Sequence, residues 1–264
     1  MITVAKIREK HCKTALSPSR LPGLDYSLNP YTGCQHGCVY CYVPNILRVT
    51  RSDWGQWVEV KTNIPTVLAR ELKTKKPGVI GLSTVTDPYQ PLEKTRRLTR
   101  YCLEQLVKAD FPVCIQTKSS LIQRDVDIIQ NLSDAEVMIS VGTLNDTLRK
   151  IMEPYSSAIQ QRIDTLHTCS NAGITTKVFF GPIYPDITKE DISTILSTFA
   201  NAGVSQVMID TLNKKPGIVP EIQKQTNAPC FKEWINYDPV WYNEIKHEIH
   251  HLGKHLNFSI VDAF

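Results

Sequence analysis

The segment that decides the fold class is "PVCIQTKSSLIQRDVDIIQNL", residues 112–132. It joins a short apolar run typical of a buried strand, "PVCIQT", to a stretch with helical spacing of its apolar residues, "LIQRDVDIIQNL". The same order recurs along residues 63–210, and it is typical of parallel βα units. A G-x-G-x-x-G fingerprint is absent, which disfavours a dinucleotide-binding fold. We therefore predict an α/β protein built as a partial (β/α)6 TIM-type barrel.

The pattern predicts individual elements and three parts of the chain. Strands are expected in "GVIGLSTV" (78–85), "PVCIQT" (112–117), "EVMISV" (136–141), "TTKVFFGPI" (175–183) and "SQVMID" (205–210), and helices over 63–74, 91–108, 121–132, 158–171 and 188–203. The predicted parts are an N-terminal extension (1–24), the barrel (25–211) and a C-terminal flap and cap (212–264). In the last part, residues 213–229 read as a polar linker or flap, 239–252 as a helix, and "NFSIV" (257–261) as a final apolar run.

Composition excludes several classes of protein. The 264 residues are 42% hydrophobic and 21% charged, as in ordinary globular domains. No uncharged run approaches the length of a membrane span, and the N-terminus lacks the apolar core of a secretion signal. We expect a cytoplasmic protein, with no membrane partner. A net charge of +4 permits an anionic partner without requiring one.

The stretch "NPYTGCQHGCVYCYVPN", residues 29–45, carries three cysteines, Cys34, Cys38 and Cys41, in the spacing C-x3-C-x2-C. It follows a strand expected within "DYSLNPY" (25–31), so the thiols are placed at the end of a barrel strand, where the active sites of barrel enzymes lie. In a reducing compartment such thiols bind metals or act in catalysis more often than they form disulfides. Three thiolates on a four-iron, four-sulfur cluster leave one iron open to a substrate or cofactor.

Alternative interpretations of the cysteines remain open. A structural zinc bound by the three cysteines with His36 or a remote cysteine would make the chain a zinc-stabilised nucleic-acid binder, and a closed cluster would make it an electron carrier. The other cysteines favour structural roles: Cys102, Cys114 and Cys169 fall on apolar faces or helix ends, while Cys12 and Cys230 lie in irregular segments. Either of the last two could instead quench a radical or ligate a second cluster.

The cysteine spacing, with an aromatic residue before the last cysteine, resembles the signature of the radical S-adenosylmethionine (radical SAM) superfamily. The segments "STVTDPYQP", "IQTKS", "SVGT", "MEP" and "GPIYP" resemble the spore photoproduct lyase-like branch of it, over residues 25–190. The resemblance implies a [4Fe-4S] cluster and S-adenosylmethionine as cofactors. It also implies reductive cleavage of S-adenosylmethionine to a 5′-deoxyadenosyl radical that abstracts hydrogen from a substrate.

The same resemblance implies partners. A nucleic acid or nucleotide is the favoured substrate, and a peptide, a small metabolite or a protein side chain remains possible. The electron would come from a donor such as a ferredoxin or a flavodoxin.

The resemblance also assigns roles to residues. Cys34, Cys38 and Cys41 would ligate the cluster. Tyr40 and Tyr42 would lie near the adenine and the substrate, although ordinary aromatic packing explains them as well. Lys118, at the end of its strand, would meet the carboxylate of S-adenosylmethionine, for which a compact cation on a long stem is suited.

Further cofactor contacts are expected from side chains near strand ends. Thr86 and Asp87 would bond polar groups of S-adenosylmethionine, or else only shape the turn into Pro88. Ser140 matches a serine that contacts the cofactor, although such a serine is often only a turn residue. Glu153 would bond the ribose or form a structural ion pair with Arg162, and Ile183 would offer backbone groups to the adenine. These residues complete the predicted cofactor site.

One position departs from the lyase pattern. Spore photoproduct lyase uses a cysteine after its second strand as a hydrogen donor, and Thr84 takes that place here. No cysteine occurs between Cys41 and Cys102, and a hydroxyl cannot replace a thiol as hydrogen-atom donor. We therefore expect Thr84 only to line the cofactor site, and we do not expect repair of the spore thymine lesion.

Overall fold

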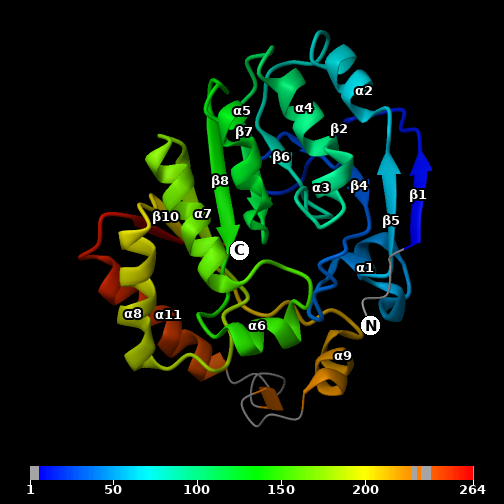
Figure 1. Ribbon diagram of the computed structural model, residues 1–264. Coiled ribbons are helices and arrows are strands. Elements are labelled where there is room, and N and C mark those ends of the chain that lie inside the picture. Colours follow the sequence, from blue (N-terminus) through cyan, green and yellow to red (C-terminus); the bar gives the residue numbers. More distant parts are fainter. Residues whose placement is uncertain (1–5, 227–230, 233–238, 264) are drawn as a thin grey trace.

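The computed structural model describes residues 6–226, 231–232 and 239–263. Its main feature is a sheet whose strands follow the spatial order β11-β10-β9-β8-β7-β6-β3-β2 (Figure 1). These strands are β2 (Leu16–Pro18), β3 (Tyr26–Leu28), β6 (Ile80–Leu82), β7 (Val113–Thr117), β8 (Ala135–Ser140), β9 (Thr175–Phe180), β10 (Gln206–Ile209) and β11 (Ser259–Asp262). All neighbours from β3 to β11 pair in parallel, and β2 pairs antiparallel with β3. The sheet is open, and the predicted α/β fold class is confirmed.

A second, smaller sheet carries the start of the cysteine segment. It contains β1 (Lys6–Lys10), β5 (Trp57–Lys61) and β4 (Tyr31–Thr32), in that spatial order. Val58 and Val60 of β5 are buried while their neighbours in the strand are half-buried, so one face of the strand packs on the core. Because β4 pairs with β5, the chain enters the cysteine segment along a fixed strand.

Helices connect the parallel strands. They are α1 (Val43–Leu47), α2 (Ile64–Glu71), α3 (Glu93–Arg96), α4 (Leu98–Leu106), α5 (Val126–Ile129), α6 (Asp146–Met152), α7 (Ile159–Asn171), α8 (Lys189–Asn201), α9 (Ile218–Gln225) and α11 (Pro239–Gly253), with 3-10 turns η1 (Arg51–Asp53) and η2 (Ser120–Asp125). Local chemistry sets several of their starts. The Asn145 side chain, for example, accepts the backbone N–H groups of Thr147 and Leu148 and so begins α6.

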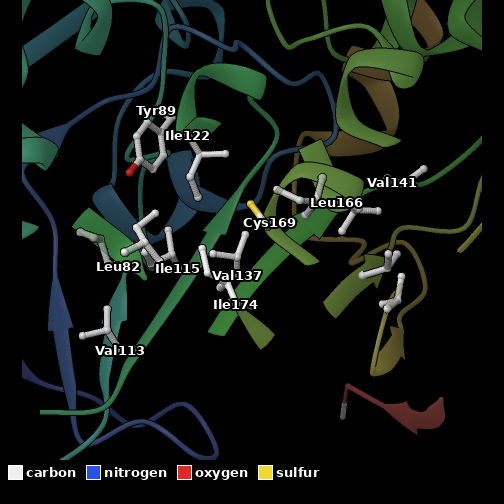
Figure 2. Packing of buried hydrophobic residues seen from close by; sticks show 14 of the residues in the cluster. Leu82, Tyr89, Val113, Ile115, Ile122, Val137, Val141, Leu166, Cys169 and Ile174 are labelled. Carbon is white, nitrogen blue, oxygen red and sulfur yellow. The ribbon is translucent and has the colours of Figure 1, made fainter. Parts of the chain in front are cut away.

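The core lies between the sheet and these helices. Figure 2 shows Leu82, Ile115 and Val137 in a row across neighbouring strands, with Val137 nearest to Cys169 of α7, and all four side chains are fully buried. Burying an aliphatic side chain of this size stabilises the fold by about 1.5–3 kcal/mol. Cys102 of α4 is also fully buried, so Cys102 and Cys169 behave as small apolar core residues, as the sequence suggests.

The helix predicted over residues 91–108 is wrong in one respect, because the structure breaks it into α3 and α4. Arg97, between them, adopts a left-handed conformation with φ of 53°. The Glu93 carboxylate accepts the backbone N–H groups of Thr99 at 3.0 Å and Arg100 at 3.3 Å. The carboxylate thereby accepts hydrogen bonds from N–H groups in the first turn of α4, which have no partner within the helix. This stabilises the start of a new helix.

Two other segments also differ from prediction. The expected helix over residues 121–132 begins as the 3-10 turn η2, and only Val126–Ile129 is α-helical. The segment expected to be a polar linker contains α9, whose Ile218 and Ile222 are four positions apart on one face and both fully buried. The final apolar run forms β11, which extends the parallel sheet at its edge.

Figure 1 shows α6 and α9 at the end of the molecule toward which the arrow of β8 points. The carboxyl ends of the parallel strands meet at this end. No helix in the described ranges is long and apolar enough to cross a membrane. Cys230 lies outside the described residues, as do positions 1–5 of the predicted N-terminal extension.

Candidate functional site

The cysteine loop, defined as residues 33–42, runs from β4 to α1 and is fastened to three other parts of the chain. The Val39 backbone N–H donates to the Met152 carbonyl at 2.9 Å, and the Gln35 N–H donates to Gln90 Oε1 at 2.9 Å. The Arg51 guanidinium donates to the Cys41 carbonyl at 2.7 Å. These contacts fasten the backbone of the loop to α6, to η1 and to the segment after β6.

The three cysteines of the loop are free thiols, and Cys34 and Cys41 are near enough to Cys38 to raise its pKa. Cys34 and Cys38 are buried and Cys41 is half-buried. Burial, with a smaller contribution from the neighbouring Cys34, raises the pKa of Cys41 to about 12. Burial also raises the pKa of Cys38 well above its ordinary value. Clustered buried thiols become thiolates only when a cation compensates their charge, so this donor set fits an iron–sulfur cluster.

His36 lies beside Asp87 and Cys34, which outweigh burial and raise the pKa of its imidazole to about 10. Its ring is 2% exposed, and its Nδ1 lies 3.2 Å from Oδ2 of Asp87 without the geometry of a hydrogen bond. Within the described ranges, no group of three or more His, Cys, Asp or Glu side chains is arranged around a single metal ion.

Tyr40, Glu153 and Arg162 form what we term the loop-end network. The Tyr40 hydroxyl donates to one carboxylate oxygen of Glu153, and the Arg162 guanidinium donates to the other. Arg162 also donates to the Ser140 carbonyl at 2.7 Å and to the Ser156 hydroxyl. The predicted Glu153–Arg162 ion pair therefore exists, and it is almost completely buried, at 2% and 0% exposure.

Tyr31, Glu93 and Arg124 form a second trio, the loop-start network. Tyr31 lies just before the cysteine loop and donates its hydroxyl to Glu93. Arg124 donates to the other Glu93 oxygen at 2.8 Å and also to Asp125 at 2.7 Å. Sequence reasoning missed this network, because its members come from β4, α3 and η2 and share no motif.

Lys118 follows the last residue of β7 and faces the loop-end network. Its Nζ lies 6.0 Å from the centre of the Tyr40 ring, and its backbone N–H donates to Asp87 at 2.9 Å. Burial would lower the pKa of Lys118, but Glu153 and Cys38 outweigh it and raise the pKa. Lys118 forms no ion pair with a described residue, so its ammonium group suits an anionic ligand.

The side chains after β6 are engaged with protein partners. Asp87 accepts hydrogen bonds from the Thr117 hydroxyl at 2.7 Å and the Tyr89 N–H at 2.8 Å, in addition to the Lys118 N–H. Thr86 donates to the Gly33 carbonyl at 2.5 Å, and Thr84 is bonded through both its N–H and its hydroxyl to the Asn29 amide. These contacts hold the loop, and a role in cofactor binding stays a prediction for all three.

The remaining predicted residues lie around the same end of the sheet. Ser140, the last residue of β8, is buried, and its hydroxyl accepts a long hydrogen bond of 3.4 Å from Gln116. Ile183 is buried, and its N–H already donates to the Asp210 carbonyl at 3.1 Å, which leaves only its carbonyl for adenine. Tyr42 is 36% exposed, whereas Tyr40 is 8% exposed. Only Tyr40 therefore belongs to the buried wall of the site.

An aromatic cover was also missed by sequence reasoning. Tyr184 packs edge-on against Tyr40, with ring centres 6.1 Å apart, and Phe231 packs against Tyr184 at 6.5 Å. Ile218 and Ile222 of α9 join the same cluster. The segment "GPIYP" contains Tyr184 and was the available signal. The cover excludes water from one side of the cysteine loop.

Comparisons with known proteins agree with this geometry. The family model described as the radical SAM superfamily matches residues 28–199, more than half of the chain. An uncharacterised protein of Methanocaldococcus jannaschii is 36% identical over 188 residues, which cover 70% of each chain. Spore photoproduct lyase of Clostridium acetobutylicum is 21% identical over 173 residues, covering 62% of this chain and 48% of the lyase.

A solved structure supports the fold. A spore photoproduct lyase mutant with bound AdoMet and dinucleoside spore photoproduct superposes with a TM-score of 0.71 at 13% identity. The superposition covers 98% of this chain and 82% of the lyase chain. The family implies a four-iron cluster and S-adenosylmethionine. The chain therefore belongs to the radical SAM superfamily, and within it resembles spore photoproduct lyase in sequence and in fold.

Proposed function

We propose that this chain is an enzyme that cleaves S-adenosylmethionine reductively to start radical chemistry on a second substrate. The observation that carries the proposal is the convergence of three neighbouring thiols, two of them buried, and the Lys118 ammonium at one end of a parallel sheet. When bound, the cluster and S-adenosylmethionine supply an electron and the 5′-deoxyadenosyl radical. Cys34, Cys38 and Cys41 hold the cluster at the loop.

The protein's own residues bind and orient the cofactor. Lys118 attracts the carboxylate of S-adenosylmethionine, because its ammonium lacks an ion-pair partner among the described residues. Tyr40 presents its ring beside Lys118, and Glu153 holds the Tyr40 hydroxyl in place. Ser140 and the Ile183 carbonyl lie nearby to receive polar groups of the nucleoside. The cover formed by Tyr184 and Phe231 keeps water from the radical.

The proposed substrate is a nucleic acid or a nucleotide. The support is the likeness to a lyase whose solved structure contains a dinucleoside photoproduct, together with the modest positive charge of this chain. Thr84 stands where the lyase has its hydrogen-donating cysteine, so the reaction is not thymine-lesion repair by that route. A peptide is the second candidate, because the radical itself does not select the substrate.

The test is anaerobic reconstitution with iron and sulfide, followed by dithionite and S-adenosylmethionine. We expect stoichiometric 5′-deoxyadenosine and methionine, and we expect Cys38→Ala to abolish both. Cys114→Ala is the matched control, since Cys114 is a half-buried cysteine on β7 outside the cysteine loop. A cluster ligated by four protein thiolates, bound zinc alone, or turnover retained in Cys38→Ala would refute the proposal in favour of an electron carrier or a zinc protein.

A further inference from the structure

A buried histidine, His36, occupies the middle of the first half of the cysteine loop. In the sequence it follows Cys34 by two residues and precedes Cys38 by two, and its side chain is only 2% exposed. The Nδ1 atom is buried and has no hydrogen-bond partner among the described residues, although Oδ2 of Asp87 lies 3.2 Å away. Buried polar atoms without a partner are rare in folded proteins, so a histidine kept here requires an explanation.

Asp87 lies beside the imidazole and is itself held firmly by other groups. Its carboxylate accepts hydrogen bonds from the Thr117 hydroxyl at 2.7 Å, the Tyr89 N–H at 2.8 Å and the Lys118 N–H at 2.9 Å. The carboxylate cannot turn away from His36 without breaking these three bonds. The end of β7, which carries Lys118, is thereby connected through Asp87 to the cysteine loop.

The second polar neighbour of the imidazole is a candidate cluster ligand. The Cys34 side chain is buried and lies close enough to His36 for a side-chain hydrogen bond. Because both side chains are buried, an N–H group directed at the sulfur acts in surroundings of low dielectric constant, where a hydrogen bond is stronger than in water. The Asp87–His36–Cys34 order resembles the carboxylate–histidine pairs that orient and tune metal ligands from outside the coordination shell.

We propose that His36 is a positioning residue that donates an N–H to the Cys34 sulfur when the cluster is bound and thereby raises the reduction potential of the cluster. This inference rests on the proposed function. A hydrogen bond to a ligand sulfur stabilises the reduced cluster more than the oxidised one, because the reduced cluster carries one more negative charge. Asp87 keeps the ring in place, so it acts on the cluster through His36.

The first experiment measures the reduction potential of the cluster. Reconstituted wild type, His36→Leu and His36→Gln are titrated anaerobically without S-adenosylmethionine, and electron paramagnetic resonance follows the reduced cluster. We expect the midpoint potential of His36→Leu to fall by about 59 mV, which is a tenfold change in the one-electron equilibrium constant. His36→Gln keeps an N–H donor and should recover about half of that loss. His167→Leu, the same substitution at an exposed histidine of α7, is the matched control and should keep the wild-type potential.

A second measurement needs no substitution. Protein that carries ¹⁵N-labelled histidine is reduced, and pulsed electron paramagnetic resonance measures the coupling between the cluster spin and the imidazole nitrogen. We expect a weak coupling in wild type and in His167→Leu, typical of a hydrogen bond to a ligand sulfur, and none in His36→Leu. A strong coupling, typical of nitrogen bonded to iron, would overturn the proposal and make His36 a ligand. No coupling in wild type, or an unchanged potential in His36→Leu, would also overturn it.

Failure of this inference is distinguishable from failure of the proposed function. If wild-type protein does not cleave S-adenosylmethionine with dithionite, the proposed function fails whatever the role of His36. If wild type cleaves S-adenosylmethionine but neither its spectrum nor its potential depends on His36, only the role of His36 fails. The wild-type spectrum decides the question even if His36→Leu takes up no cluster.

Discussion

The two ends of the cysteine loop are held by the same three residue types in very different surroundings. In both networks a tyrosine donates to a glutamate whose other oxygen accepts from an arginine. Arg162 of the loop-end network is fully buried, whereas Arg124 of the loop-start network is 21% exposed. The same tyrosine–glutamate–arginine arrangement is therefore partly exposed to water in the loop-start network and buried in the loop-end network.

The partners of the two carboxylates differ as well. Glu93 also accepts two backbone N–H groups of α4, and Arg124 has a second carboxylate in Asp125. In the loop-end network, Glu153 is the only carboxylate that pairs with Arg162 among the described residues. The loop-start network therefore keeps several contacts when one member is lost. The loop-end network keeps the hydrogen bonds of Arg162 to Ser140 and Ser156 but has no second carboxylate among the described residues, and it is the one that faces Lys118.

The largest difference should appear when each arginine is replaced. Arg162→Met leaves Glu153 charged and buried, and we expect it to lower the free energy of unfolding by about 3–5 kcal/mol. Arg124→Met should cost only about 1–2 kcal/mol, because Glu93 retains Tyr31 and the α4 backbone as partners. Denaturant unfolding of the two variants measures both losses, and equal losses would show that burial does not separate the networks.

Acid should weaken the loop-end network in a defined range of pH. Burial alone would raise the pKa of Glu153, but Arg162 and then Lys118 outweigh it and lower the pKa from 4.5 to about 2. A carboxyl group with a lowered folded-state pKa stabilises the protein above its unfolded pKa and loses that effect as the pH falls. The stabilisation should therefore be complete above pH 4.5 and disappear toward pH 2.

The measurement is the free energy of unfolding of wild type and Glu153→Gln as a function of pH. The difference in the free energy of unfolding between wild type and Glu153→Gln should become smaller as the pH falls from 4.5 toward 2. The effect should be smaller than that of Arg162→Met, because Arg162 keeps the Ser140 carbonyl and the Ser156 hydroxyl as acceptors when Glu153 is protonated. Asp110→Asn, at an exposed carboxylate, is the control and should follow wild type throughout. A gap that does not change with pH would contradict the assigned role of Glu153.

The strands could be predicted from sequence because parallel strands are short apolar runs, and each predicted run contains one. The break at Arg97 could not, because it depends on the Glu93 side chain folding back onto the next helix. Helix α9 was hidden by Pro220 and Lys224 within it and by the polar residues around it, although Ile218 and Ile222 carried a weak helical signal. The local sequence pattern thus predicted an element correctly where the packing of the chain agreed with that pattern. It failed where a contact between distant parts of the fold determined the backbone conformation.

The residues of the candidate site also differ in whether a local sequence signal predicts them. The spacing of Cys34, Cys38 and Cys41 is a local signal, and the resemblance of "IQTKS" and "MEP" to family segments indicated Lys118 and Glu153. Tyr31 and Glu93 are 62 positions apart and belong to no motif, so only the folded chain brings them together. The sequence therefore predicts the residues proposed to touch the cofactor better than those that hold the loop in place.

The smallest effect, and the sharpest separation of the two networks, should come from removing one hydroxyl at each. Tyr40→Phe should cost about 1–2 kcal/mol of stability, because it removes the donor to one buried oxygen of Glu153. Tyr31→Phe should cost less, because the Glu93 oxygen that loses Tyr31 keeps the Thr99 N–H. Only Tyr40 contacts the site proposed for S-adenosylmethionine, through Lys118. We therefore expect Tyr40→Phe to weaken binding of S-adenosylmethionine about threefold and Tyr31→Phe to leave it unchanged, as measured by calorimetry on reconstituted protein. If Tyr31→Phe weakens binding equally, the loop responds as one body and the two networks do not differ in function.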